Sequence, residues 1–584
     1  MSGASRQGES VADAVGRALA AAGAEVVFGV LGSGNLVVTN ALVAGGARFV
    51  AARHEAGAVC MADGWARVSG GVGVASVHQG PGLTNAITGI AEAVKSHTPL
   101  LVLAADTPAA AIHSNFRIDQ HGLVESVGAA AERIHSPASA VEDALRAWRR
   151  AELERRPLVL MLPLDVQASQ APAQSAGLVS SDDTKPVVVP APAASAVAQA
   201  AGQLAAARRP VIVAGRGAVL ADARAALEAL AARCGALLAT SAPANGLFDG
   251  AAFALGIAGG FATPLALELL PQADLVLAFG ATLNQWTTRH GTLFGDAQVI
   301  QIDVDPTVLG AHGPRAATIV GDAAATAEAI LNALPPGDAP GWRSPDLAAE
   351  IVTRRWSDEP LEAAAAPRAD GGPKDHHRSA AADLRASLPP GTERTTVDPR
   401  ALTIALDRIL PADRLVAVDS GHFLGWPAMY LPVRDARAWV FPNGFQAVGL
   451  GLGNAIGAAV AEPERITVAA LGDGGAFMAL PELETAVRLG LELLVLIYDD
   501  AAYGAEVHHF APAGHDVTGA RFPDADLAAL GRAAGAEAVT VRSTDDLQAV
   551  ETWVAAGAGG PLVVDAKVDP SICAAWLEDA FRGG

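Results

Sequence analysis

The sequence predicts an α/β protein of three domains, each with a parallel sheet covered by helices on both faces. Short apolar segments of strand length alternate with Ala-rich amphipathic segments along most of the 584 residues, as expected for strands joined by crossover helices. Hydrophobic residues make up 51% of the chain and charged residues only 18%, which provides enough apolar material for several buried cores.

The expected strands fall into three blocks, with room for a helix between most consecutive strands. Each block should therefore form a sheet of its own. The expected strands are Val26–Val30, Val72–Val77, Leu100–Ala104 and Leu158–Leu162 in the first block, Val211–Ala214, Leu275–Phe279 and Val299–Val304 in the second, and Leu415–Val418, Ile466–Ala470, Leu493–Ile497 and Leu562–Val564 in the third.

Two stretches interrupt this pattern. Residues 167–194 are rich in Ala, Pro, Ser and Val, which is typical of a linker. Residues 335–396 carry Pro-Pro-Gly and Gly-Gly-Pro around a mixed-charge middle, which indicates a linker or a mobile lid. The predicted domains are therefore residues 1–166, 195–334 and 397–584.

The composition argues against several classes of protein. The formal net charge of −21 disfavours nucleic acid or a membrane surface as a partner. The three cysteines lie far apart, the N-terminus is polar, and no run of about 18 apolar residues is present. These features predict a cytoplasmic protein without disulfides, a signal peptide or a transmembrane helix.

Residues 471–475, Leu-Gly-Asp-Gly-Gly, stand between an expected strand and an expected helix at 480–489. The backbone N–H groups of such a Gly-rich turn, with a helix N-terminus behind it, can bind a phosphate group. Asp473 adds a hard carboxylate oxygen of the kind that Mg²⁺ prefers. Taken alone, such a short motif is more often an ordinary turn.

A second candidate ligand follows the next strand. Residues 493–497 run directly into Tyr-Asp-Asp-Ala-Ala-Tyr-Gly at 498–504. Because neighbouring parallel strands end at the same edge of a sheet, where ligands bind, Asp499 or Asp500 should lie near Asp473.

These two segments resemble the thiamine diphosphate-dependent enzymes, in which Gly-Asp-Gly is followed one strand later by Asn-Asn-x-x-Tyr-Gly. The resemblance implies that Asp473, Asp500 and the carbonyl of Ala502 bind Mg²⁺, with Asp499 as the alternative to Asp500 if the register shifts. Asp500 stands where the family has Asn, so the site carries an additional negative charge. The resemblance further implies cofactor contacts from Gly472, Gly474, Gly475, Tyr503 and Gly504.

The resemblance extends to residues 52–67, where Arg-His-Glu precedes Ala-Asp-Gly-Trp-Ala-Arg. Thiamine diphosphate reacts as a C2 carbanion once a carboxyl group hydrogen-bonds its pyrimidine N1′, and Glu55 falls at the position of that catalytic glutamate. The role requires a buried carboxyl group that retains or shares a proton; the alternative is a solvated glutamate at a helix N-terminus. In the family this glutamate and the metal site belong to different subunits, which implies a homodimer or homotetramer.

Residues 77–85, Val-His-Gln-Gly-Pro-Gly-Leu-Thr-Asn, resemble the family's loop beside the thiazolium ring. This resemblance implies cofactor contacts from Pro81 and Asn85. His78 stands where benzoylformate decarboxylase has a catalytic histidine, and an imidazole there could transfer protons. A hydrogen-bonded loop histidine is the alternative interpretation.

Other positions follow from the same resemblance. Gly32 matches a loop whose backbone approaches the cofactor's amino group. Val448 matches the apolar residue that bends the cofactor, although a core valine would pack in the same way. Gln120 is a candidate catalytic residue because Phe116 and Gln120 lie where acetolactate synthases place a Phe-Gln pair facing the substrate. His508 and its neighbour could contact substrate or belong to an exposed lid.

The middle block resembles the family's central domain at residues 210–217, Pro-Val-Ile-Val-Ala-Gly-Arg-Gly, and at residues 302–306. That domain binds FAD in acetolactate synthases and pyruvate oxidases. The family's Gly-Met-His-Gly stretch is replaced by Gly-Ile-Ala-Gly at 256–259. We therefore expect a central domain that lacks FAD.

The residues together predict a thiamine diphosphate- and Mg²⁺-dependent, acetolactate synthase-like carboligase. It would decarboxylate a 2-oxo acid and join the remaining fragment to a carbonyl acceptor. The alternative favoured by His78 is a 2-oxo acid decarboxylase of the benzoylformate decarboxylase type, which releases an aldehyde. A non-catalytic nucleotide-binding homologue is the alternative from another class, and Glu55 with Asp473 and Asp500 argues against it.

Overall fold

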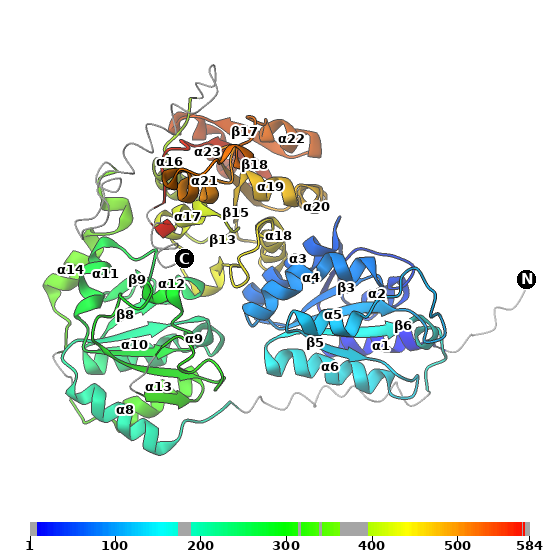
Figure 1. Ribbon diagram of the computed structural model, residues 1–584, viewed down its shortest axis with the longest axis horizontal. Helices are drawn as coiled ribbons and strands as arrows, with labels where there is room; N and C mark the ends of the chain where they lie inside the picture. The colour runs from blue at the N-terminus through cyan, green and yellow to red at the C-terminus, as the bar shows by residue number, and fades with distance from the viewer. Residues whose placement is uncertain are drawn as a thin grey trace, which may run out of the picture.

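The computed structural model describes residues 9–172, 189–313, 317–337, 341–361, 395–574 and 576–577. It contains three six-stranded sheets, and all their strand pairings are parallel. Figure 1 shows an N-terminal unit in blue and cyan, a central unit in green and a C-terminal unit in yellow to red. The predicted α/β class with three parallel sheets is confirmed. Large parts of both expected linkers, residues 173–188 and 362–394, lie outside the described residues.

The N-terminal sheet has the strand order β2-β1-β3-β4-β6-β5. Successive side chains of a strand enter opposite faces, so in β3 Val74 packs into one helix layer while Ala75 and Val77 pack into the other. The strands are β1 (Val26–Gly29), β2 (Arg48–Ala51), β3 (Gly73–Val77), β4 (Leu100–Asp106), β5 (Ala130–Arg133) and β6 (Pro157–Pro163). One face carries α1 (Val11–Ala21), α2 (Leu36–Ala44), α6 (Ala140–Glu154) and α7 (Leu164–Gln167), and the other carries α3 (Glu55–Ser69), α4 (Pro81–Lys95) and α5 (Gln120–Ser126).

The C-terminal sheet repeats this topology with the order β14-β13-β15-β16-β18-β17. Its strands are β13 (Leu415–Val418), β14 (Trp439–Val440), β15 (Thr467–Gly472), β16 (Leu493–Asp499), β17 (Glu537–Val541) and β18 (Leu562–Lys567). Its helices are α16 (Pro399–Ile409), α17 (Gly425–Tyr430), α18 (Gly451–Ala461), α19 (Asp473–Ala479), α20 (Pro481–Leu489), α21 (Gly504–Phe510), α22 (Leu527–Ala534) and α23 (Gln548–Ala555).

The central sheet has the order β12-β11-β10-β7-β8-β9, which reverses between β7 and β10. Its strands are β7 (Pro210–Ala214), β8 (Leu237–Thr240), β9 (Ala254–Ile257), β10 (Leu275–Phe279), β11 (Gln298–Asp303) and β12 (Ala317–Val320). Its helices are α8 (Ala194–Ala206), α9 (Arg216–Leu220), α10 (Arg224–Cys234), α11 (Pro264–Leu269), α12 (Gln285–Thr288), α13 (Ala323–Ala333) and α14 (Pro345–Thr353).

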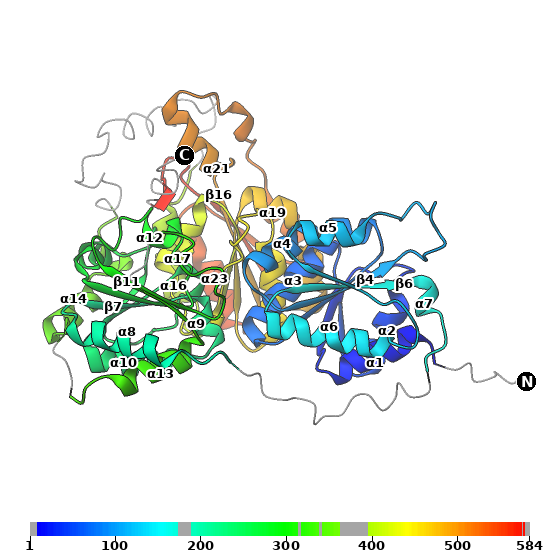
Figure 2. The same cartoon turned by 60° about the horizontal axis from the view of Figure 1, so that its bottom comes forward.

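Helices α3 and α18 join the N-terminal and C-terminal units, and Figure 1 shows them next to each other. Their backbones approach closely, since a Cβ atom built at Gly457 would lie only 1.9 Å from the carbonyl oxygen of Met61. Apolar side chains of both units share one buried core. Figure 2 shows the C-terminal unit between the other two. Within the described part of the chain, no helix is both long and apolar enough to cross a membrane.

Candidate active site

Two of the sheets carry candidate site residues at the same topological position. The strand order reverses between β1 and β3 in the N-terminal sheet and between β13 and β15 in the C-terminal sheet. In open parallel sheets, ligands bind beyond the carboxyl ends of the strands at such a point. The segments there lead to Gly32 and His78 in the N-terminal unit, and to Asp419 and Asp473 in the C-terminal unit.

Asp473 and Asp500 lie at one sheet edge because β15 and β16 are neighbours, with Gly472 opposite Tyr498 in the register. Helix α19 begins at Asp473 itself, whereas the sequence predicted a turn followed by a helix at 480–489. That later helix is present as α20, which starts at Pro481. The Gly-rich motif is therefore the first turn of a helix that directly follows the strand.

The electrostatics of this edge favour a cation. Asp473 and Asp500 are only 7% and 8% exposed. Burial, followed by the charges of Asp500 and Asp499, raises the pKa of Asp473 to about 9, since carboxylates so close together repel one another when ionised. A divalent cation would relieve that repulsion.

The oxygen donors present here fit Mg²⁺, which takes carboxylates together with phosphate oxygens and water. Within the described residues, no three His, Cys, Asp or Glu side chains are arranged to hold a metal ion by themselves. A Mg²⁺ ion bound to Asp473 and Asp500 would therefore need further oxygens, such as the carbonyl of Ala502 and a diphosphate.

The loop after β16 brings these donors together. Asp500 Oδ1 accepts a hydrogen bond from the Ala502 N–H at 3.1 Å. A Cβ atom at Gly504 would lie 2.3 Å from Asp500 Oδ2 and 2.5 Å from His422 Cε1. Glycine at 504 thus allows α21 to begin directly against the carboxylate.

A cleft of about 1680 Å³ opens at this edge and is lined by residues of all three units. Asp419 anchors one wall by accepting hydrogen bonds from the N–H groups of Gly449 at 2.9 Å and Leu450 at 3.1 Å. Burial outweighs these bonds and raises the pKa of Asp419 to about 6. The structure gathers in this cleft the C-terminal residues predicted to bind cofactor and metal, namely Val448, Gly472, Asp473, Gly474, Gly475, Asp500, Ala502, Tyr503 and Gly504.

The predicted N-terminal residues form a second group. Asn85 Nδ2 donates a hydrogen bond to Glu55 Oε2 at 3.0 Å. The ring of His78 meets Phe116 edge-on, with centroids 5.0 Å apart, and lies against Gly32. Glu55 is the first residue of α3 and is half-buried. We call the half-exposed surface formed by Gly32, Glu55, His78, Pro81 and Asn85 the N-terminal patch.

Gln120 lies behind this patch. It is 3% exposed, its Oε1 accepts a hydrogen bond from the Gly80 N–H at 2.8 Å, and its Nε2 donates to the Ala105 carbonyl at 3.0 Å. The amide therefore fixes the turn that precedes Pro81. A catalytic role for Gln120 stays a prediction.

The N-terminal patch and the cleft are separate within one chain, because no residue of the patch is among the described residues that line the cleft. Each contains part of the predicted site. We call these two groups the half-sites of the predicted site, one with Glu55 and one with Asp473.

His422 was missed by the sequence analysis. It is 8% exposed, and its Nε2 lies 3.8 Å from Asp500 Oδ2. Its ring lies beside that of His508 at a centroid distance of 5.0 Å. Burial, followed by His508, lowers the pKa of His422 well below its usual 6.5. A single histidine between two apolar segments gave no signal in the sequence.

The central unit contributes to the cleft at its own switch point. Arg216 and Gly217 follow β7, Gly280 follows β10, and all three line the cleft. Arg216 Nη2 donates to Thr98 Oγ1 of the N-terminal unit at 3.1 Å. Burial, followed by the charge of Arg67, lowers the pKa of Arg216 to about 9. The expectation that this unit lacks FAD stays a prediction.

The repeated parallel sheets, with buried carboxylates where a strand leads directly into a helix, define an α/β protein with a candidate ligand site at the carboxyl ends of its strands. Models of the thiamine pyrophosphate enzymes match three parts of the chain: the N-terminal thiamine pyrophosphate-binding domain at residues 9–130, the central domain at 197–330 and the C-terminal thiamine pyrophosphate-binding domain at 419–566. The chain belongs to this enzyme family, as the sequence motifs predicted.

Relatives within the family carry different activities in their names. The chain is 31% identical over 562 residues to the probable 2-ketoarginine decarboxylase AruI of Pseudomonas aeruginosa, covering 93% of this chain and 91% of the relative. It is 29% identical over 587 residues to a sulfoacetaldehyde acetyltransferase of Rhodobacter capsulatus, covering 96% and 94%. It is 30% identical over 498 residues to the large subunit of acetolactate synthase isozyme 3 of Escherichia coli, covering 83% and 81%.

Proposed function

We propose that this chain is a Mg²⁺- and thiamine diphosphate-dependent carboligase that decarboxylates a 2-oxo acid and joins the remaining fragment to a carbonyl acceptor. The observation that carries the proposal is the pair of buried carboxylates, Asp473 and Asp500, beside a Gly-rich turn in one cleft. This arrangement offers hard oxygens and phosphate-binding N–H groups at one point. The volume of about 1680 Å³ exceeds that of an ordinary single-ligand pocket, which supports a cofactor together with two substrates.

Each half-site has a separate task in this proposal. When bound, thiamine diphosphate supplies a nucleophilic carbon that adds to the 2-oxo carbonyl and accepts the electron pair left by carbon dioxide. Glu55 holds a proton at the pyrimidine N1′, and Asn85 orients the Glu55 carboxyl group. His78 exchanges a proton with the substrate oxygen. Val448 would support the cofactor from the cleft wall.

We infer that the complete site forms between two copies of the chain, in a homodimer or homotetramer. Within the described chain Glu55 and Asp473 belong to separate half-sites. Large exposed apolar side chains gather near both, and such surfaces are typical of interfaces. They are Leu31 and Phe116 at the N-terminal patch, and Phe477 and Met478 in α19.

A simple 2-oxo acid decarboxylase is the second candidate, supported by His78, whose ring carries a potential proton donor beside Glu55. Incubating the protein with Mg²⁺, thiamine diphosphate and a panel of 2-oxo acids, with and without aldehyde acceptors, separates the two. Pyruvate and 2-ketoarginine belong in that panel. Release of carbon dioxide together with a product that joins the donor fragment to the acceptor supports the carboligase. Release of carbon dioxide together with a free aldehyde supports the decarboxylase. Lack of turnover with every donor would refute both and favour a non-catalytic homologue.

A further inference from the structure

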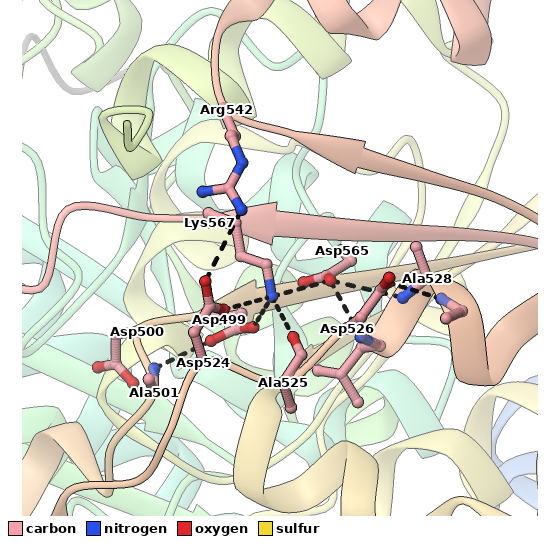
Figure 3. A network of polar contacts seen from close by, with 12 residues as sticks. Asp499, Asp500, Ala501, Asp524, Ala525, Asp526, Ala528, Arg542, Asp565 and Lys567 are labelled. Atoms are coloured by element: carbon pink, nitrogen blue, oxygen red, sulfur yellow. Dashed lines mark hydrogen bonds and ion pairs between the residues drawn. The ribbon is translucent and has the colours of Figure 1, made fainter. Parts of the chain in front are cut away.

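A buried lysine lies behind the loop of residues 500–503 between β16 and α21 (Figure 3). We call this loop the metal loop, because it carries the predicted Mg²⁺ ligands Asp500 and Ala502. The Nζ of Lys567 lies 2.5 Å from Asp499 Oδ2, 2.9 Å from Asp565 Oδ2 and 3.0 Å from Asp524 Oδ1. It also donates to the carbonyl oxygen of Ala525 at 2.5 Å. The side chains of Lys567 and Asp499 are each 2% exposed. The lysine therefore neutralises two buried carboxylates, Asp499 and Asp565, and also contacts the partly exposed Asp524.

The strands determine these contacts. Asp565 and Lys567 are two residues apart in β18, so their side chains point to the same face of the sheet. Strand β18 pairs with β16, and Lys567 is the register partner of Asp499. The segment before α22 adds Asp524 and Ala525 from outside the sheet. One lysine thus connects two adjacent strands with the segment that follows the metal loop.

Asp499 extends this connection to the metal loop. Its Oδ1 accepts a hydrogen bond from the Ala501 N–H at 3.0 Å. Ala501 has a left-handed φ of 56°, which a residue with a side chain keeps only when its surroundings favour it. In Figure 3, Asp499 points toward Lys567, whereas the next residue, Asp500, points away from it.

We propose that Lys567 is a positioning residue for the Mg²⁺ site. By neutralising Asp499, it keeps that carboxylate inside the sheet, where Oδ1 holds the Ala501 turn and so presents Asp500 and the Ala502 carbonyl to the ion. This inference rests on the proposed function, because it requires a bound Mg²⁺ ion. It also accounts for Asp499-Asp500 at the place of the family's Asn-Asn. The added charge of Asp499 is paired with Lys567 behind the site, and the added charge of Asp500 is directed to the Mg²⁺ position.

The direction of the change in Mg²⁺ affinity distinguishes a positioning role of Lys567 from a simple effect of its charge. Removing a positive charge near the site would strengthen the attraction of the loop for Mg²⁺. Removing a support of the loop would weaken Mg²⁺ binding, because groups that orient metal ligands typically contribute about 10- to 100-fold to metal affinity. Lys567→Met therefore tests the proposal by the direction of the change.

The measurement is a calorimetric titration of Mg²⁺ into the full-length protein with excess thiamine diphosphate. Lys567→Met is expected to lower Mg²⁺ affinity by about 10- to 100-fold. Lys567→Met combined with Asp499→Asn removes both charges and keeps an oxygen for the Ala501 N–H, so it should recover affinity to within about threefold. Asp565 stays bonded to the Leu527 N–H at 3.1 Å. Unchanged or tighter binding by Lys567→Met, or no recovery in the double variant, overturns the proposal.

A second pair of variants covers the case in which Lys567→Met does not fold. Asp499→Ala removes the acceptor of the Ala501 N–H and should lower Mg²⁺ affinity about tenfold or more, whereas Asp499→Asn should stay within about threefold. Arg542→Met removes the outer ion pair with Asp524, at 3.7 Å, and a hydrogen bond to the Thr395 carbonyl, at 3.2 Å. It leaves Lys567 and Asp499 paired and is the control with normal binding. Normal Mg²⁺ binding by Asp499→Ala overturns the inference alone. Absence of Mg²⁺ binding by the unmodified protein refutes the proposed function, and the inference with it.

Discussion

Asn85 of α4 donates a hydrogen bond to Glu55, the first residue of α3, with 3.0 Å between Nδ2 and Oε2. This bond engages one oxygen of the carboxyl group. No hydrogen bond from the described part of the chain engages Oε1, which faces Gly82. The geometry leaves one side of Glu55 available for a ring nitrogen at the surface of the N-terminal patch.

Glu55→Gln should therefore damage the reaction more than the binding of the cofactor. The amide keeps the bond with Asn85 but cannot share a proton as a carboxyl group does. We expect kcat to fall by about 10²- to 10⁴-fold, the range of a lost general acid–base group. Cofactor affinity, measured by calorimetry with Mg²⁺ present, should change little. Near-normal turnover by the variant would show that Glu55 has another role.

Mg²⁺ binding should release a proton from Asp473. Because the pKa of this carboxyl group is raised to about 9, it is protonated at pH 7 and must ionise to bind the metal. Mg²⁺ affinity should then rise between pH 6 and pH 8 by up to about tenfold per pH unit. Calorimetry in buffers with different ionisation enthalpies measures the number of protons released.

Asp473→Asn is the matched control for this pH dependence. The variant lacks the titrating group, so its weaker Mg²⁺ binding should vary far less with pH. A pH dependence in Asp473→Asn as steep as in the unmodified protein would assign the proton to another residue.

Gly457→Ala should destabilise the junction between the N-terminal and C-terminal units. The new methyl group would meet the Met61 carbonyl of α3 at 1.9 Å, and overpacking of this kind typically costs about 1–3 kcal/mol. Gly202→Ala is the control, because it also lies within a helix but has open space around it. It should be neutral or stabilise the protein by up to about 1 kcal/mol. Equal melting temperatures for the two variants would contradict the tight packing of α3 against α18.

The sequence predicted the strands inside the sheets better than those at the edges. Strand β16 is buried along its whole length and reads as an apolar run, as strands covered on both faces do. Strands β2 and β12 lie at sheet edges and expose part of their side chains. Both strands are only four residues long and each includes a polar residue, Arg48 in β2 and Thr318 in β12, as edge strands often do, so neither was singled out.

For the candidate site as well, features set by one short segment could be predicted, whereas contacts between segments far apart in the chain could not. The proximity of Asp473 and Asp500 could be predicted because each directly follows a strand, and adjacent parallel strands end together. His422 and Lys567 could not, since their importance arises from contacts with Asp500 and Asp499, which are far from them in the chain. A pairing of distant segments has no signature in one sequence.

Mixing two inactive variants tests whether the half-sites of different copies complete one another. Glu55→Gln retains an intact cleft, and Asp473→Ala retains an intact N-terminal patch. If each active site combines the patch of one copy with the cleft of the other, random exchange of an equal mixture makes half of the dimers hybrid. Each hybrid has one complete site, so activity should recover to about a quarter of that of the unmodified protein. A mixture that exchanges subunits yet stays inactive would show that Glu55 and Asp473 must act within the same chain.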